Sequence, residues 1–139
     1  LDLGAEPLVA ACAPAFLAAH PVAGPRDLLE LPLLQLETRP RAWERWFAHH
    51  GIAQAAPQGM IFDQFATMTQ AAIAGVGIAL LPEFLAEAEF ADGRLTRAWG
   101  APVPGRGRYW LVWPRARAEY PPLRAVRDWL ATQPLNAAP

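Results

Sequence analysis

The chain has 139 residues, enough for a single domain with a sizeable core, and 53% of them are hydrophobic, which excludes a disordered segment. Its net charge is −1 and all twelve basic residues are arginine, so it lacks the basic excess that a nucleic-acid-binding domain needs to pair with phosphates. The single cysteine, Cys12, excludes an internal disulfide and a multi-cysteine zinc site, and we interpret it as a small, semi-buried core residue.

Short apolar runs alternate with helical patterns along the chain, which indicates an α/β sheet. The stretch Leu1–Glu6 is polar and irregular, and we expect no regular element there. The first predicted elements are a strand, a helix opened by Pro14, a helical turn and a second strand: Leu8–Cys12, Ala15–Ala19, Pro25–Glu30 and Leu33–Leu36.

A tryptophan-rich helix is predicted next, beginning at Pro40 and closed by Gly51 as its C-terminal cap. Four of its side chains recur at i, i+3, i+4 and i+7 and draw one stripe: Trp43, Trp46, Phe47 and His50. This helical spacing favours core packing of the two tryptophans over an aromatic lid on a ligand.

The middle of the chain predicts a second strand–helix–strand–helix series. Asp63 is the N-cap candidate of its first helix, whose Phe65, Met68 and Ala72 share one face, and Gly75 stops that helix. The continuous apolar run before Pro82 suits a strand buried on both faces. The predicted elements are Met60–Phe62, a helix through Ala74, Val76–Leu81, and a helix that starts at Pro82 and ends near Phe90.

The last third predicts two strands, Leu95–Trp99 and Tyr109–Trp113, after an Asp92-Gly93 turn. A loop rich in proline and glycine, residues 102–107, separates them. A terminal helix, Pro121–Thr132, places three apolar side chains inward: Leu123, Val126 and Leu130. We expect the tail from Pro134 to be frayed.

This ordered series resembles the rear half of the effector domain of LysR-type transcriptional regulators. Glu6–Pro14 resembles the strand that enters the second effector subdomain, and Phe62–Pro82 is the most specific stretch. The tryptophan helix, Trp43–Phe47 with Gly51, looks like the glycine-cleavage-activator branch. Further matching stretches follow in family order: Asp27-Leu28 before Pro32–Leu34, Asp92–Leu95, Tyr109–Val112 and Arg127–Leu130.

The resemblance implies an α/β, periplasmic-binding-protein-like subdomain with a mixed, mostly parallel sheet flanked by helices. Residues 1–113 would form the second effector subdomain, and residues 114–139 a C-terminal helix and tail that pack on a first subdomain without counterpart here. The implied function is sensing of a small-molecule effector, with pairing of copies into a homo-oligomer. DNA would bind only through an N-terminal domain absent from this chain.

Ligands of open α/β sheets bind where strand carboxyl ends meet helix amino ends, and helix N–H groups there favour anions. Three such junctions occur, and the predicted effector-binding residues are Ala13, Thr38, Arg39, Ile61, Phe62 and Asp63. We expect a small polar or acidic metabolite, without cofactor or metal. Alternatives remain open: Asp63 as a cap only, Ile61 as a core residue, and Thr38 with Arg39 as a solvated loop.

The sequence shows no recognisable set of catalytic residues, and we do not expect the protein to be an enzyme. The chain contains no serine, and the adjacent His49 and His50 point in different directions on a helix, which favours a surface or half-buried role over a shared metal. No apolar run approaches the roughly 20 residues of a membrane span, and no signal peptide is visible, so we expect a cytoplasmic protein. The alternatives are a periplasmic-type solute-binding protein and an enzyme centred on Cys12 or His50.

Overall fold

The computed structural model describes residues 1–133. The chain divides into two compact units: a larger one, Pro7–Val103, and a smaller one that combines Leu1–Glu6 with the residues from Pro104 onward. Two long strands, β1 (Asp2–Cys12) and β5 (Thr96–Trp110), contribute residues to both units. The units are described separately below.

The sheet has five strands in the order β3-β2-β4-β1-β5. Its shorter strands are β2 (Leu33–Leu36), β3 (Ile61–Phe62) and β4 (Ile78–Pro82). β2 pairs parallel with both β3 and β4, whereas β1 pairs antiparallel with β4. The predicted mixed sheet is therefore confirmed.

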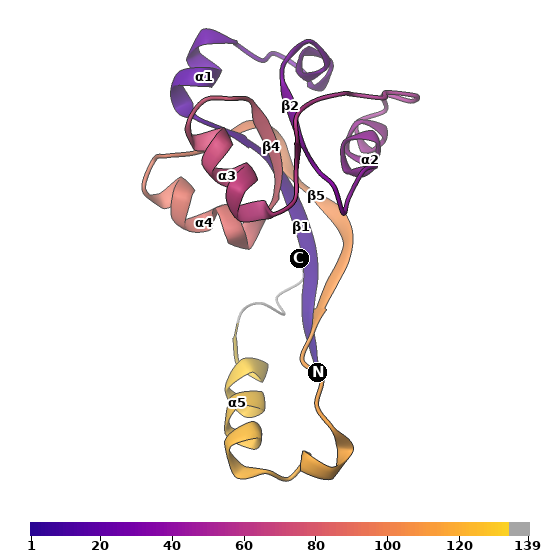
Figure 1. The fold of residues 1–139 in the computed structure, drawn as a ribbon, viewed down its shortest axis with the longest axis vertical. Helices are drawn as coiled ribbons and strands as arrows, with labels where there is room; N and C mark the ends of the chain where they lie inside the picture. Colours follow the sequence, from indigo (N-terminus) through magenta and orange to yellow (C-terminus); the bar gives the residue numbers. More distant parts are fainter. Residues whose placement is uncertain (134–139) are drawn as a thin grey trace. The chain divides into compact units, whose positions relative to one another are not determined.

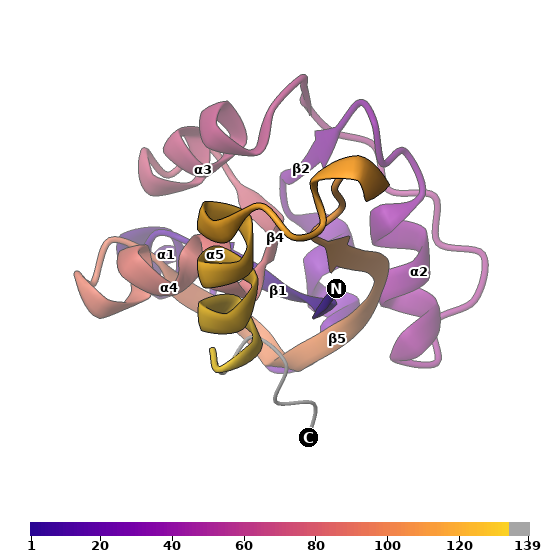
Figure 2. The same ribbon diagram turned by 90° about the horizontal axis from the view of Figure 1, so that it is seen from below.

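Helices cover both faces of the sheet in the larger unit. Figures 1 and 2 show α2 (Ala42–His49) on one side of β2 and β4, and α3 (Phe65–Ile73) with α4 (Glu83–Ala91) on the other. The other helical elements of this unit are α1 (Pro14–Ala19) and the 3₁₀ helix η1 (Pro25–Glu30). Predicted helices therefore form at all five places, with ends shifted by at most two residues.

Two apolar clusters fill the spaces on either side of the sheet, because neighbouring residues of a strand point to opposite faces. Ile78 and Leu80 pack with α1, η1 and α2, whereas Ala79 and Leu81 pack with α3 and α4. Such two-sided burial explains why β4 is a continuous apolar run.

The tryptophans of α2 lie in the core, as predicted. Trp43, Trp46 and Phe47 are buried, and the Trp43 indole N–H donates to the Leu34 carbonyl at 2.8 Å. Cys12 is fully buried in the same cluster, which confirms its interpretation as a core residue. Burial raises the pKa of its thiol to about 11.

The prediction of two strands separated by a loop near the end of the chain is wrong. A single strand, β5, runs through residues 102–107 and ends at Trp110, so Trp113 lies beyond it. Proline has no N–H for a sheet ladder and is tolerated on an edge strand, where one side of the backbone needs no partner. β5 is the edge strand, next to β1.

Other boundaries also differ from prediction. Residues 2–6, expected to be irregular, belong to β1, where Gly4 has a positive φ of 120°. Pro82 ends β4 instead of starting a helix, and α2 starts at Ala42, two residues after Pro40. A proline at the end of a strand costs little because few ladder bonds remain to be made there.

The smaller unit contains α5 (Pro121–Ala131) and a 3₁₀ turn, η2 (Arg115–Arg117). The predicted helix is confirmed, but its apolar face is not buried within the described residues. Leu123 and Leu130 are half-buried, Val126 is 48% exposed and Trp129 is 61% exposed. The predicted frayed tail from Pro134 lies outside the described residues. Within residues 1–133, no helix is long and apolar enough to cross a membrane.

Candidate functional site

The carboxyl ends of β2 and β3 meet at one edge of the sheet. Their parallel register places Leu36 beside Phe62, and the Glu37 N–H donates to the Phe62 carbonyl at 2.8 Å. The chain then turns away from each strand into a helix, through residues 37–41 before α2 and residues 63–64 before α3. This edge, called the carboxyl edge below, therefore brings Thr38, Arg39 and Asp63 to the same side of the sheet.

Arg39 lies against an aromatic ring at the carboxyl edge. Its guanidinium carbon lies 4.9 Å from the centroid of the Phe65 ring, and its backbone N–H donates to the Leu36 carbonyl at 2.9 Å. A cation over an aromatic face is attracted to the ring and loses conformational freedom. Arg39 is therefore a positioned cation and not only part of a solvated loop.

Arg39 and Phe65 also line a small apolar pocket between α2, α3 and the sheet. Its volume is about 10 Å³, close to the room that one water molecule needs. The lining residues are Leu8, Leu34, Gln35, Leu36, Arg39, Ala42, Trp43, Phe65, Met68 and Leu80. Arg39 and Gln35 are the polar side chains of this wall, so a ligand there would meet one charge and one amide on an apolar surface.

The β3 residues of the predicted site differ in exposure. Ile61 is 67% exposed, which argues against the core alternative, and Phe62 is half-buried against the α3 cluster. Asp63 is exposed and is not the N-cap of α3: the cap position is Gln64. The Asp63 carboxylate accepts instead from the Thr67 hydroxyl, at 3.4 Å.

Ala13 does not join the other predicted residues. Because β1 is antiparallel to β4, its carboxyl end lies beside the beginning of β4, with Ala11 paired to Ala79. Ala13, buried at the start of α1, is therefore at the edge of the sheet opposite to Arg39. The grouping of three junctions into one site is corrected to two.

Two adjacent histidines, His49 and His50, lie at the end of α2. The His49 and His50 rings are edge to face, with centroids 5.3 Å apart, and the His50 ring lies against Trp46 with centroids 4.3 Å apart and planes tilted by 56°. Burial and the neighbouring His49 lower the pKa of His50, which favours its neutral form. Among residues 1–133, no group of three or more His, Cys, Asp or Glu side chains is placed to hold a metal ion.

Two residues of the site, Phe65 and Gln35, were not predicted as functional. Phe65 was assigned only to an apolar helix face, yet the Arg39 guanidinium lies over its ring. Gln35 of β2 lines the pocket. A signal was present in Gln35, because it is the one polar residue in an otherwise apolar strand.

The family of the chain follows from comparison with known sequences. The family described as the LysR substrate binding domain matches residues 1–134. The chain belongs to this family. The predicted resemblance is thereby confirmed.

Individual LysR-type relatives agree with this assignment. The transcriptional activator AmpR of Rhodobacter capsulatus is 32% identical over 133 residues, which cover 96% of this chain and 45% of AmpR. The glycine cleavage system transcriptional activator of Escherichia coli is 32% identical over 130 residues, which cover 92% of this chain and 42% of the activator. The relatives thus include the branch that the tryptophan helix resembles.

Solved LysR-type structures share the fold. The effector domain of AmpR from Pseudomonas aeruginosa superposes with a TM-score of 0.81 at 33% identity, covering 94% of this chain and 62% of that domain. The LysR-type fold and the periplasmic-binding-protein-like class are therefore confirmed. The chain spans less than half the length of the curated relatives described here.

Proposed function

We propose that this chain is the effector-sensing region of a LysR-type transcriptional regulator and that its carboxyl edge receives a small polar or acidic metabolite. The single observation that carries the site is Arg39, whose guanidinium lies over the Phe65 ring and which lines an apolar pocket together with Phe65. Family membership supports the sensing role, since relatives of this chain are named transcriptional activators.

The charges at the carboxyl edge define the ligand chemistry. Arg39 offers donors in a planar fork that matches a carboxylate, and the starts of α2 and α3 at the same edge favour negative charge. Thr38 and Asp63 add a hydroxyl and an exposed carboxylate, which would accept from a hydroxyl or ammonium group of the ligand. A metabolite with a carboxylate and a second polar group fits this edge.

The pocket as described is too small for such a ligand, because it holds about one water molecule. Periplasmic-binding-type folds bind ligands in a cleft between two subdomains, and this chain covers 62% of the AmpR effector domain. We infer that the remaining wall comes from a part of the regulator outside this chain. Closure on the ligand would then shift the population of quaternary states.

The direct test is calorimetric titration of the full-length regulator with succinate, pyruvate, glutamate and glycine, comparing the wild type with Arg39→Gln and Arg41→Gln. Arg41 is the matched control, because it lies on the same loop, is 72% exposed and is paired with Glu44 at 2.8 Å. We expect Arg39→Gln to weaken carboxylate binding about tenfold or more, and Arg41→Gln to leave it unchanged. Equal binding by both variants would remove Arg39 from the site.

We further infer that residues 114–139 pack on the part of the regulator that lies outside this chain. The apolar face of α5, with Val126 and Trp129 exposed, is consistent with a surface that another segment covers.

We also propose that the protein is cytoplasmic, forms a homo-oligomer, and contacts DNA only through a domain outside this chain. Sedimentation of the full-length regulator and of this chain tests the assembly; a monomer in both cases would refute it.

A further inference from the structure

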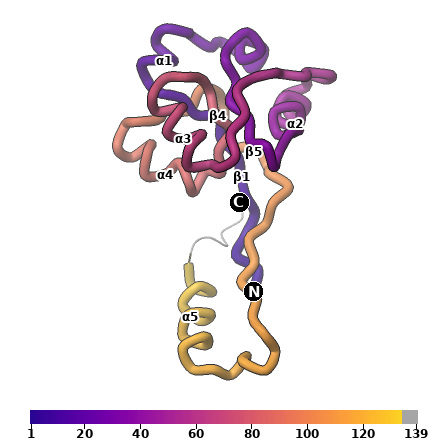
Figure 3. The backbone as a smooth tube through the Cα atoms, in the orientation of Figure 1, coloured from indigo at the N-terminus to yellow at the C-terminus, as the bar shows by residue number. Residues whose placement is uncertain are grey.

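The ring of His50 lies at the contact between the end of α2 and the strand β5. It follows the last residue of α2 and lies against Trp46, one turn earlier, with ring centroids 4.3 Å apart. Gly100 of β5 is also close, since a methyl group added there would be 3.8 Å from His50 Cε1. Figure 3 shows α2 beside β5 in the larger unit. His50 therefore contributes to the packing of α2 against β5.

Two ring nitrogens at this contact are buried and, within residues 1–133, have no hydrogen-bond partner: His50 Nε2 and Trp46 Nε1. The indole nitrogen always carries a proton. A neutral imidazole carries one proton on two nitrogens, so Nε2 can stay unprotonated when Nδ1 holds it, whereas an imidazolium has an N–H at both positions. Protonation of His50 therefore guarantees a second buried donor without an acceptor, in addition to that of Trp46.

The segments around His50 contain no charge that could compensate an imidazolium. Residues 51–60, which follow α2, and residues 98–103 of β5 have no acidic or basic side chain. Among its described residues, the apolar cluster that α2 joins has one titratable side chain, Cys12, and its thiol is uncharged at neutral pH because burial raises its pKa to about 11. A positive charge on His50 would therefore have no partner on these elements.

The ionisable side chains in and next to α2 also disfavour a charge on His50. Arg45 and His49 are basic, and Glu44 is paired with Arg41 at 2.8 Å. Burial and the neighbouring His49 lower the pKa of His50, and no carboxylate opposes them. His50 is therefore uncharged at neutral pH.

One attraction acts in the opposite direction, because the face of the Trp46 ring attracts a cation. The two rings are tilted by 56°, so the imidazole does not lie flat on the indole. This attraction is smaller than the cost of burying a charged donor without an acceptor. Protonation therefore favours a state in which the His50 ring leaves this contact and meets water.

We propose that His50 is an acid-sensitive latch that holds the end of α2 against β5. In the closed state the uncharged ring lies on Trp46 and beside Gly100. Protonation releases the ring into water, which exposes Trp46 and loosens the end of α2. Because the pKa of His50 in the closed state is below the ordinary value of 6.5, the latch is fully effective above pH 6.5 and weakens as pH falls toward the lowered pKa.

The latch acts on the carboxyl edge through α2. This helix connects residues 37–41, which contain Arg39, with residues 51–60, which lead to β3. Loosening the end of α2 therefore frees the chain that runs from one strand of this edge to the other. This regulation is additional to the proposed function and does not require that the carboxyl edge binds an effector.

The test is hydrogen–deuterium exchange of the full-length regulator, measured by mass spectrometry at pH 7.5 and pH 5.0 and expressed as protection relative to the unstructured chain at the same pH. The reporter is the Ile52 N–H, which donates to the Phe47 carbonyl at 2.9 Å and closes the end of α2. The Ile78 N–H, which donates to the Pro32 carbonyl at 2.9 Å, reports whether the rest of the larger unit stays folded.

The wild type should lose Ile52 protection at pH 5.0 while Ile78 protection stays constant. A released histidine with the ordinary pKa favours its protonated form by roughly thirtyfold at pH 5.0, which is the upper limit of the loss, and we expect a loss of at least about threefold. His50→Phe keeps a ring on Trp46 but cannot gain a proton, so its Ile52 protection should be equal at the two pH values. His49→Gln is the matched control on the adjacent residue: it should retain a loss, reduced because His49 no longer lowers the pKa of His50.

Each result decides the proposal. Equal Ile52 protection of the wild type at both pH values, or a loss in His50→Phe as large as in the wild type, would show that His50 is not the latch. A parallel loss at Ile78 would mean general acid unfolding and would also overturn the proposal. Should His50→Phe lower Ile78 protection already at pH 7.5, His50→Gln, which cannot gain a proton either, replaces it in the same comparison. No ligand is needed, so the outcome is independent of the effector site proposed above.

Discussion

Gly59 is a position at which a single added methyl group should cost much stability. It precedes β3, and a Cβ there would lie 1.7 Å from the Leu33 carbonyl oxygen. Backbone atoms cannot yield by that amount, so Gly59→Ala must move β3 away from β2 and disrupt two hydrogen bonds, Gln35 N–H to Met60 and Glu37 N–H to Phe62. At about 0.5–1.5 kcal/mol net for each bond, the free energy of unfolding should fall by about 1–3 kcal/mol.

Gly24→Ala is the matched control, because nothing lies within 4 Å of its added methyl group and its φ of −161° is extended backbone. It should stay within about 0.5 kcal/mol of the wild type. Urea unfolding followed by tryptophan fluorescence measures both, since Trp43 and Trp46 are buried in the same unit as Gly59. Equal midpoints for the two variants would refute the reasoning from the close contact of β2 with Gly59.

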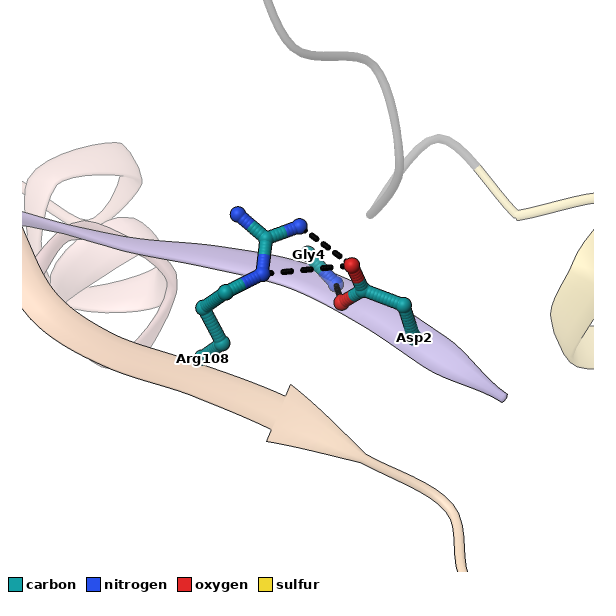
Figure 4. Close-up of polar contacts among 3 residues, drawn as sticks. All are labelled: Asp2, Gly4 and Arg108. Carbon is teal, nitrogen blue, oxygen red and sulfur yellow. Dashed lines mark hydrogen bonds and ion pairs between the residues drawn. The ribbon is translucent and has the colours of Figure 1, made fainter.

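Two further predictions concern ionisable groups. Cys12 is fully buried and its pKa is raised to about 11, so a thiol-specific reagent at pH 8 should label it only after unfolding; rapid labelling of the native chain would contradict the burial. The Arg108 guanidinium and the Gly4 N–H lower the pKa of Asp2 below its ordinary value of 3.8. Because the folded pKa is the lower one, Asp2 (Figure 4) should stabilise the pairing of residues 1–6 with residues 104–111 above pH 3.8 and lose this effect as pH falls through the folded pKa. The Leu111 N–H, which donates to the Leu1 carbonyl, reports this pairing through its rate of amide hydrogen exchange. The difference in this rate between the wild type and Asp2→Asn should vanish at that low pH; a constant difference would exclude this linkage.

Local patterns were sufficient for the helices and for strand β2, whose bounds match the prediction. The helix positions follow the 3.6-residue period, and Gly51, Gly75 and Gly93 stand at positive φ where the helical patterns stop. The course of β5 could not be predicted in the same way. Proline and glycine within residues 102–107 indicate a loop in most contexts, and only the edge position of β5 in the assembled sheet makes a strand possible there.

The candidate site was predictable in part. The Arg39 loop and the end of β3 were found because parallel strands of an α/β sheet end at one edge. The contact of Arg39 with Phe65 was not predicted, because it depends on how α3 packs beside β2. The N-cap at Gln64 was also missed, since a residue such as Asp63 caps helices more often than glutamine does.

Strand direction has the largest effect on the site, and no local pattern encodes it. The run Val9–Cys12 is as apolar as β4, because both strands are buried on two faces, and burial does not depend on the direction of the chain. Since β1 runs antiparallel to β4, its end with Ala13 lies far from Arg39, and its earlier residue Leu8 lines the pocket instead. The middle of β1 at Leu8, and not the junction of β1 with α1, is therefore the part of this strand that shapes the candidate effector site.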